Sequence, residues 1–83
     1  MILEDCAMSI TAAQIRGARA MLRMTQEDLA AKADLSQRSL AMIETEAAKP
    51  RDGTLERLKS ALEDAGVVFM ETDAGVGVIV SAT

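Results

Sequence analysis

Three helix-start signals between residues 11 and 36 constrain the fold of this chain more than any other feature. Thr11 and Gln14 have the spacing of a capping box, in which each side chain bonds the backbone of the other residue. Thr25 and Ser36 are two further candidates for helix N-caps. Three starts so close together predict three short helices joined by tight connections.

Apolar side chains follow each of these caps at helical spacing, which predicts one buried stripe on each helix. The predicted core positions are Ile15, Ala18, Leu22, Leu29, Ala30, Ala33, Leu40 and Ile43.

A loop is predicted at residues 45–53, because this segment holds the only proline and ends in glycine. Thr54 is predicted to cap a fourth helix after the loop, and Gly66 is placed to end that helix as a C′ glycine. The buried face of this helix is expected to consist of Leu55, Leu58 and Leu62.

The periodicity then changes to that of strands. The runs "VVFM" (67–70) and "VGVIV" (76–80) are separated by a turn segment that contains Asp73 and Gly75, which predicts a β-hairpin. An isolated hairpin is marginal in water, and an exposed apolar edge invites strand pairing. We therefore expect the hairpin to pack on the helices and to pair with its own copy in a homodimer. The predicted dimer-interface residues are Val76, Val78 and Val80.

The length of the chain, 83 residues, allows a single small domain. We predict a mainly α fold with an N-terminal tail at 1–10, a helical domain at 11–66 and the hairpin at 67–83. The hairpin is either part of the same domain or a dimerisation element. The core is expected to be thin, because most apolar side chains are small. The single cysteine excludes an internal disulfide, so a second subunit is the expected support.

Charge is unevenly distributed along a chain whose formal net charge is −4. Residues 11–51 carry seven basic and five acidic side chains, whereas residues 52–83 carry two basic and six acidic ones. The first ten residues add two acids and no base. The middle of the chain is therefore mildly basic between two acidic ends. This distribution allows a nucleic-acid-binding face, but one with only weak electrostatic attraction to phosphates.

The composition argues against metal chemistry and catalysis. The chain has no histidine and one cysteine, Cys6, so we expect no metal site, no cofactor and no enzyme activity. No residue is a candidate for catalysis. The N-terminus has no basic region followed by an apolar run, so we expect no signal peptide. No apolar run approaches the length of a membrane span, and we expect a cytoplasmic protein.

The second and third predicted helices are separated by a turn of about three residues, which is the arrangement of a helix-turn-helix unit. In this unit the second helix enters the major groove of DNA with its N-terminal residues toward the base edges. The segment "TQEDLAAKADLSQRSLAMIE" (25–44) resembles the core of the XRE family, the Cro/lambda-repressor type of helix-turn-helix protein. The resemblance extends from about Ile15 to Leu62 and implies that residues 11–66 form a helix-turn-helix domain.

The resemblance implies that helix 36–44 inserts into the major groove of double-stranded DNA. The DNA-binding residues that it implies are Gln26, Ser36, Gln37, Arg38, Ser39, Met42, Lys49 and Arg51. Gln37 and Arg38 would read bases, because Gln pairs with adenine and Arg with guanine through two hydrogen bonds each. Met42 could meet only a thymine methyl group, and the other residues would contact the DNA backbone.

These polar residues have a simpler interpretation as a solvated helix face and loop, and Ser36 is first of all a helix cap. Arg19 and Glu44 form a separate pair. In relatives, the matching Arg and Glu make a buried ion pair that fixes the helices, and the same structural role is implied here.

The sequence departs from the family pattern at two helix ends. Glu46 occupies a position where relatives usually have glycine, so a left-handed conformation there would be strained, and the helix is expected to run on or to end differently. Asp34 replaces a small residue in the turn, where aspartate tolerates left-handed geometry. Both changes add negative charge near the expected phosphates, and a hairpin replaces the fifth helix with which many relatives dimerise.

Two functions from different classes therefore remain. The first is a sequence-specific DNA-binding regulator that acts as a dimer on half-sites one helical turn, about 34 Å, apart. The alternative is an antiactivator or adaptor that keeps the helix-turn-helix fold but binds a protein partner. The acidic hairpin region and Glu46 favour this alternative.

Overall fold

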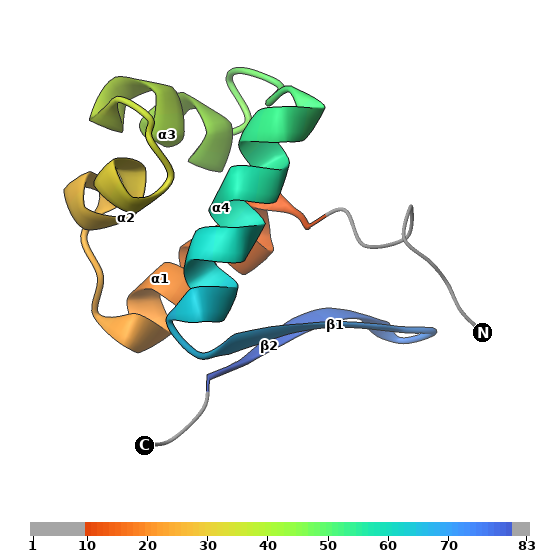
Figure 1. Ribbon diagram of the computed structural model, residues 1–83. Helices are drawn as coiled ribbons and strands as arrows, with labels where there is room; N and C mark the ends of the chain where they lie inside the picture. The colour runs from red at the N-terminus through yellow and green to blue at the C-terminus, as the bar shows by residue number, and fades with distance from the viewer. Residues whose placement is uncertain (1–9, 81–83) are drawn as a thin grey trace.

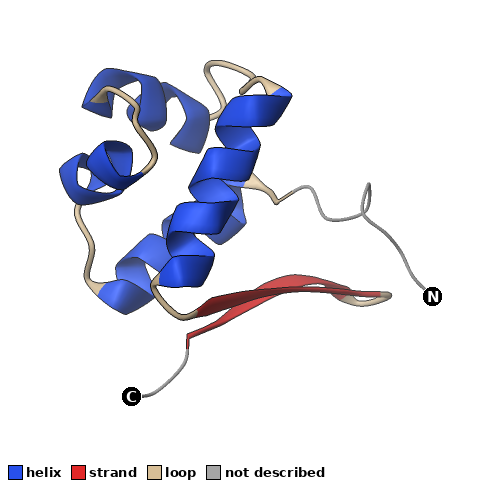
Figure 2. Cartoon of the chain, viewed as in Figure 1, coloured by secondary structure: helices blue, strands red, loops and turns tan. Residues whose placement is uncertain are grey.

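A computed structural model describes residues 10–80 of the chain, so most of the predicted tail, including Cys6, lies outside the described residues. The chain forms four helices and then an antiparallel hairpin (Figures 1 and 2). The elements are α1 (Ala12–Leu22), α2 (Gln26–Lys32), α3 (Gln37–Glu44), α4 (Asp52–Asp64), β1 (Val67–Thr72) and β2 (Gly75–Val80). This order confirms the predicted mainly α fold with a C-terminal hairpin. Within residues 10–80, no helix is long and apolar enough to cross a membrane.

The three predicted N-caps are confirmed. The backbone N–H of Gln14 donates to Thr11 Oγ1 at 3.1 Å, and Thr11 N–H donates to Gln14 Oε1 at 2.9 Å, which completes the capping box. Thr25 caps α2 through a second capping box with Asp28. Ser36 Oγ accepts from the N–H of Ser39 at 3.1 Å. Ser36 is therefore the cap, and helix α3 itself begins one residue later.

The predicted start of the fourth helix is wrong. Helix α4 begins at Asp52, and its N-cap is Arg51, which makes no side-chain capping hydrogen bond. The N–H of Leu55 donates to the carbonyl of Arg51 at 2.9 Å, so the first helical turn is already closed around Thr54. The loop is correspondingly shorter than predicted.

One apolar core joins the helices and the first strand. Its largest fully buried apolar side chains are Ile15, Leu29, Leu40, Leu58 and Leu62, so that each helix contributes at least one. The predicted inward faces are confirmed, with Leu22 and Leu55 only partly buried at the margin of the cluster. Burial of these side chains is the main stabilising term for so small a domain.

Every helix is followed by a residue in the left-handed region of backbone conformation. These residues are Arg23 (φ 57°), Asp34 (φ 59°), Glu46 (φ 63°) and Gly66 (φ 103°). Only Gly66 is a glycine, and it ends α4 as predicted, with its N–H donating to the carbonyl of Glu63. Glu46 does adopt the strained conformation, so the expectation that α3 would run on or end differently is wrong. Helix α3 ends at Glu44, and the N–H of Ala47 donates a hydrogen bond to the carbonyl of Met42 at 2.9 Å.

The hairpin has longer strands and a shorter turn than predicted, with Asp73 and Ala74 alone between the strands. It lies across the helices, with β2 against α1 and β1 against α4 (Figure 1). One face packs on the helical core through Val67, Phe69, Val78 and Val80. The opposite face presents exposed Val68, Met70 and Ile79. Two of the three residues expected at a dimer interface, Val78 and Val80, therefore face the chain's own helices, and Val76 is exposed.

Candidate nucleic-acid interface

Helices α2 and α3 pack on each other and form the helix-turn-helix unit, with residues 33–36 as the connection. The unit lies at the end of the molecule opposite the hairpin (Figure 1). Asp34 takes the left-handed conformation in the turn, as its short polar side chain allows. We call α3 the recognition helix.

A buried carboxylate fixes the recognition helix from behind. Glu44 is 1% exposed and accepts from Arg19 Nε at 2.9 Å and from Arg19 Nη2 at 3.0 Å. Its Oε1 also accepts from Gln26 Nε2 at 3.0 Å. A buried charge costs much free energy unless it is paired and hydrogen-bonded, and here both carboxylate oxygens have partners. The network links α1, α2 and α3 at one point.

The two implied base-reading residues, Gln37 and Arg38, occupy the first turn of the recognition helix, and both are exposed. Neither side chain makes a hydrogen bond to another residue in the described part of the chain. Met42 lies further along the same helix and is 37% exposed. These side chains are available for contact, while Leu40 and Ile43 hold the opposite face of the helix in the core.

Ser36 and Ser39 are hydrogen-bonded to each other at the start of the recognition helix. Ser36 Oγ accepts from the N–H of Ser39 and donates to Ser39 Oγ at 3.0 Å. Both residues are exposed. The hydroxyl of Ser36 is therefore used in capping, whereas the hydroxyl hydrogen of Ser39 is left for a phosphate oxygen.

Gln26 has a different environment from the one expected for a DNA-backbone contact. Its amide nitrogen donates to Glu44, and its side chain is half-buried. An amide group carries two hydrogens, so one remains for a phosphate. Gln26 therefore belongs first to the network that positions the recognition helix.

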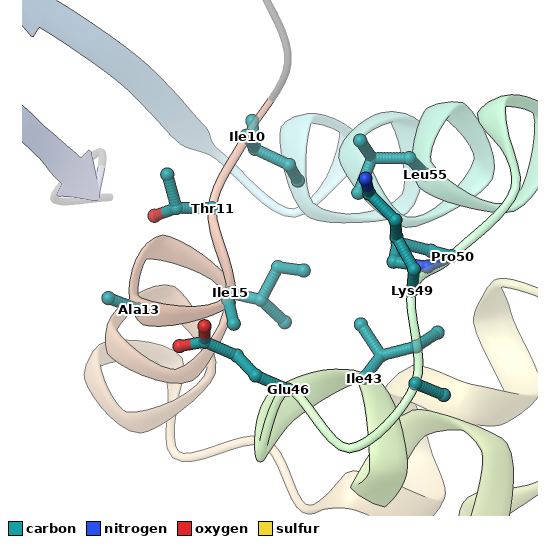
Figure 3. Close-up of a pocket in the computed structure, with 11 residues that line it drawn as sticks. Ile10, Thr11, Ala13, Ile15, Ile43, Glu46, Lys49, Pro50 and Leu55 are labelled. Atoms are coloured by element: carbon teal, nitrogen blue, oxygen red, sulfur yellow. The ribbon is translucent and has the colours of Figure 1, made fainter.

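Lys49 and Arg51 are exposed in the loop between the recognition helix and α4. A pocket of about 470 Å³ lies beneath this loop, between the start of α1 and the end of the recognition helix (Figure 3). Ile15, Ile43 and Leu55 form much of its apolar wall. The side chain of Glu46 extends over the pocket toward α1. Its carboxylate is thus turned toward the start of a helix, where negative charge is favourable.

Two arginines that sequence reasoning missed also hold the unit together. Arg16 donates from Nη1 to the backbone carbonyl of Glu44 at the end of the recognition helix. Arg57 Nε donates to the carbonyl of Ala33 at 2.9 Å and so ties α4 to the end of α2. The attraction of cations to helix C-termini is a general signal, but the sequence does not show which arginine reaches which helix.

The arrangement offers groups that are suited to binding. On the recognition helix and the loop that follows it, the exposed basic side chains are those of Arg38, Lys49 and Arg51, which suit phosphate and guanine contacts. No group of three His, Cys, Asp or Glu residues in the described part of the chain is placed to hold a metal ion.

A comparison with models of protein families agrees with this geometry. A family model described as helix-turn-helix matches residues 15–63, which is more than half of the chain and covers most of α1 through most of α4. A separate comparison with curated proteins found no match. The matched region contains the Glu44 network and the exposed first turn of the recognition helix. The chain therefore belongs to the XRE family of helix-turn-helix DNA-binding regulators.

Proposed function

We propose that the protein is a dimeric, sequence-specific transcriptional regulator that inserts the recognition helix into the major groove of double-stranded DNA. One observation carries the proposal. Gln37 and Arg38 project freely from the first turn of a helix that the buried Glu44 network holds rigid. Both side chains are suited to two hydrogen bonds with a base edge, and rigid support is what such readout requires.

Phosphate contacts come from residues around this turn. Lys49 and Arg51 supply charge from the loop, Ser39 supplies a hydroxyl, and Gln26 supplies its second amide hydrogen. These contacts position the helix on the duplex but carry little sequence information. With few basic contacts in each subunit, specific binding depends on two half-sites bound by a homodimer.

The dimer forms through the hairpin in this proposal. The side chains of Val78 and Val80 are partly buried against the chain's own helical core, which leaves less of them for a partner. The outward face supplies exposed apolar side chains instead, namely Val68, Met70 and Ile79. Strand β2 also has no charged residue along its length, so two copies of its edge can approach without charge repulsion.

Selection of bound sequences from random DNA tests the proposal. We expect the protein to enrich a near-palindromic site that contains guanine at the position read by Arg38. Arg38→Lys is the matched variant, because it keeps the positive charge but loses the bidentate hydrogen bonds to guanine. It should lose preference for that guanine by about tenfold while it keeps salt-dependent binding. A folded protein that enriches no sequence would refute the proposal.

The second candidate function is an antiactivator or adaptor that binds a protein partner. The exposed apolar face of the hairpin is the observation that favours it. A pull-down that captures a transcription factor, is abolished by Val68→Asp and is unaffected by Arg38→Ala would support this function. Loss of regulation by Arg38→Ala with partner capture intact would contradict it.

A further inference from the structure

The side chain of Gln14 does more than cap α1. Gln14 is 5% exposed, and its Nε2 donates to the carbonyl of Gly77 at 2.9 Å and to the carbonyl of Met70 at 3.3 Å. Met70 and Gly77 are directly opposite each other in the hairpin. The buried amide group of Gln14 therefore contacts both strands at one pair of opposite residues, while its oxygen accepts a hydrogen bond from the N–H of Thr11.

We infer that Gln14 is a positioning residue that fixes the hairpin on α1 and thereby sets the separation of the two recognition helices in the dimer. The second part of this inference rests on the proposed function. The first part concerns the described contacts alone and is testable without DNA.

The chemistry of the side chain supports a role beyond capping. A capping box needs only an acceptor at this position, and glutamate serves as well as glutamine. The two contacts with the hairpin need donors, which glutamate lacks. The Gln14 amide nitrogen donates to two strand carbonyls, so the hairpin contacts favour glutamine over glutamate at this position, whereas the cap does not.

Within the part of the chain that the structure describes, the hydrogen bonds of Gln14 are also the only directional contacts that locate the hairpin. Among residues 10–80, no other hydrogen bond joins the hairpin to a helix. The remaining contacts are apolar, and such packing is not directional. Gly17, one turn further along α1, faces Val78 Cγ2 and presents no side chain that would hold the strand in place.

Helix α1 connects the hairpin to the recognition helix. Gln14 holds the hairpin, while Arg16 and Arg19 on the same helix hold Glu44 at the end of the recognition helix. A change in the orientation of the hairpin on α1 therefore moves the recognition helix relative to any partner that is bound through the hairpin. Half-sites on DNA have a fixed separation, so a dimer needs this orientation to be fixed.

Gln14→Glu and Thr11→Ala separate the two roles. The glutamate keeps the capping acceptor, removes both donors and places a carboxylate against two carbonyl oxygens. Thr11→Ala removes the capping hydroxyl but keeps the amide on the hairpin. Gln14→Met, which keeps the length of the side chain without an amide, is the second variant in case the glutamate prevents folding.

Amide hydrogen exchange on the full chain is the first measurement. We expect exchange in residues 67–80 to be about tenfold faster in both Gln14 variants, relative to residues 29–62 of the same protein. Thr11→Ala should affect the first turn of α1 and leave the hairpin unchanged. Equal hairpin exchange in wild type and both Gln14 variants, or an equal effect of Thr11→Ala, would overturn the inference.

Binding to palindromes whose half-sites are moved apart by single base pairs is the second measurement. Wild type should prefer one spacing, and Gln14→Met should lose that preference while its affinity for a single half-site stays within about twofold. Unchanged spacing preference would overturn the role in the dimer. If wild type binds no DNA at all, the proposed function fails, and hydrogen exchange still decides whether Gln14 holds the hairpin.

Discussion

At the scale of single residues, the helix ends carry an unusual amount of backbone strain. Arg23, Asp34 and Glu46 all adopt left-handed conformations that favour glycine. Such a conformation costs an L-residue about 1–2 kcal/mol, although aspartate is more tolerant. Glu46 has neither a short side chain nor a hydrogen bond accepted by its carboxylate to offset this cost among the described contacts. We therefore expect recoverable free energy at Glu46.

Glu46→Gly should increase the free energy of unfolding by about 0.5–1 kcal/mol. Relief of the strained backbone is partly offset, because glycine also gives the unfolded chain more freedom. Glu46→Gln is the matched control, since it removes the charge and keeps the strain, and it should give no such gain. Urea denaturation followed by circular dichroism measures both. A glycine variant no more stable than wild type would show that the loop relieves the strain in another way.

At the scale of elements, the hairpin has two apolar faces with different partners. One face completes the core, and the other presents Val68, Met70 and Ile79 to solvent. A charged side chain is therefore expected to reduce stability on the inward face and to reduce binding on the outward face. On the inward face it must be buried against the helices, whereas on the outward face it affects only what binds there.

Val68→Asp should give a folded monomer, because Val68 is 55% exposed and the proposed dimer buries it. Ala74→Asp places the same charge in the exposed turn and should remain a dimer. Val78→Asp should instead unfold at lower urea concentration, since its side chain packs on the core. Sedimentation velocity gives the oligomeric state and denaturation gives the stability. A Val68→Asp protein that sediments as the same dimer as wild type would count against this face.

The elements also show how far sequence reasoning reaches. The starts of α1, α2 and the recognition helix were predictable, because a Thr or Ser side chain caps each one. The start of α4 was not, since the side chain of its N-cap, Arg51, makes no capping bond. The orientation of the hairpin was also hidden. Strand β2 consists only of valine, isoleucine and glycine, so neither face carries polar side chains. The sequence pattern therefore does not distinguish an inner from an outer face.

Within the candidate interface, the partners of Glu44 were only partly predictable. The family resemblance implied the pair with Arg19, and the exposed positions of Gln37 and Arg38 followed from the apolar stripe of the helix. The bond from Gln26 to Glu44 was not visible, because it depends on how two helices pack. The role of Gln14 was missed for another reason: the capping box already explained the residue, and its strand contacts are 56 and 63 residues away.

At the scale of the whole molecule, a net charge of −4 opposes binding to DNA, while the basic side chains of Arg38, Lys49 and Arg51 favour it. These three are exposed on the recognition helix and the loop that follows it, whereas six of the acids lie in residues 52–83. The electrostatic part of DNA binding is therefore local and small. Affinity should fall with salt, but less steeply than for a strongly basic protein.

Lys49→Ala should make the salt dependence of DNA binding shallower. Each phosphate contact contributes a slope of about −0.9 to the plot of log affinity against log salt, so loss of Lys49 from both subunits should reduce the slope by about 2. Lys59→Ala is the matched control, because Lys59 lies on α4 beside Glu63, at 3.7 Å. Fluorescence anisotropy at several salt concentrations gives the slopes. An unchanged slope for Lys49→Ala would mean that Lys49 does not contact a phosphate.

The contacts of Gln14 also have a consequence for the order of folding. The hydrogen bonds that join the helices to one another through Glu44 and Arg57 span 18 to 28 residues, whereas the hairpin is joined to α1 across 56 and 63 residues. Contacts that close long loops form late, because the chain must lose more entropy before it gains them. We therefore expect the helix-turn-helix unit to assemble first and the hairpin to dock last. In a ribosome-bound chain the recognition helix would then be in place before the apolar strands are available to associate with another copy.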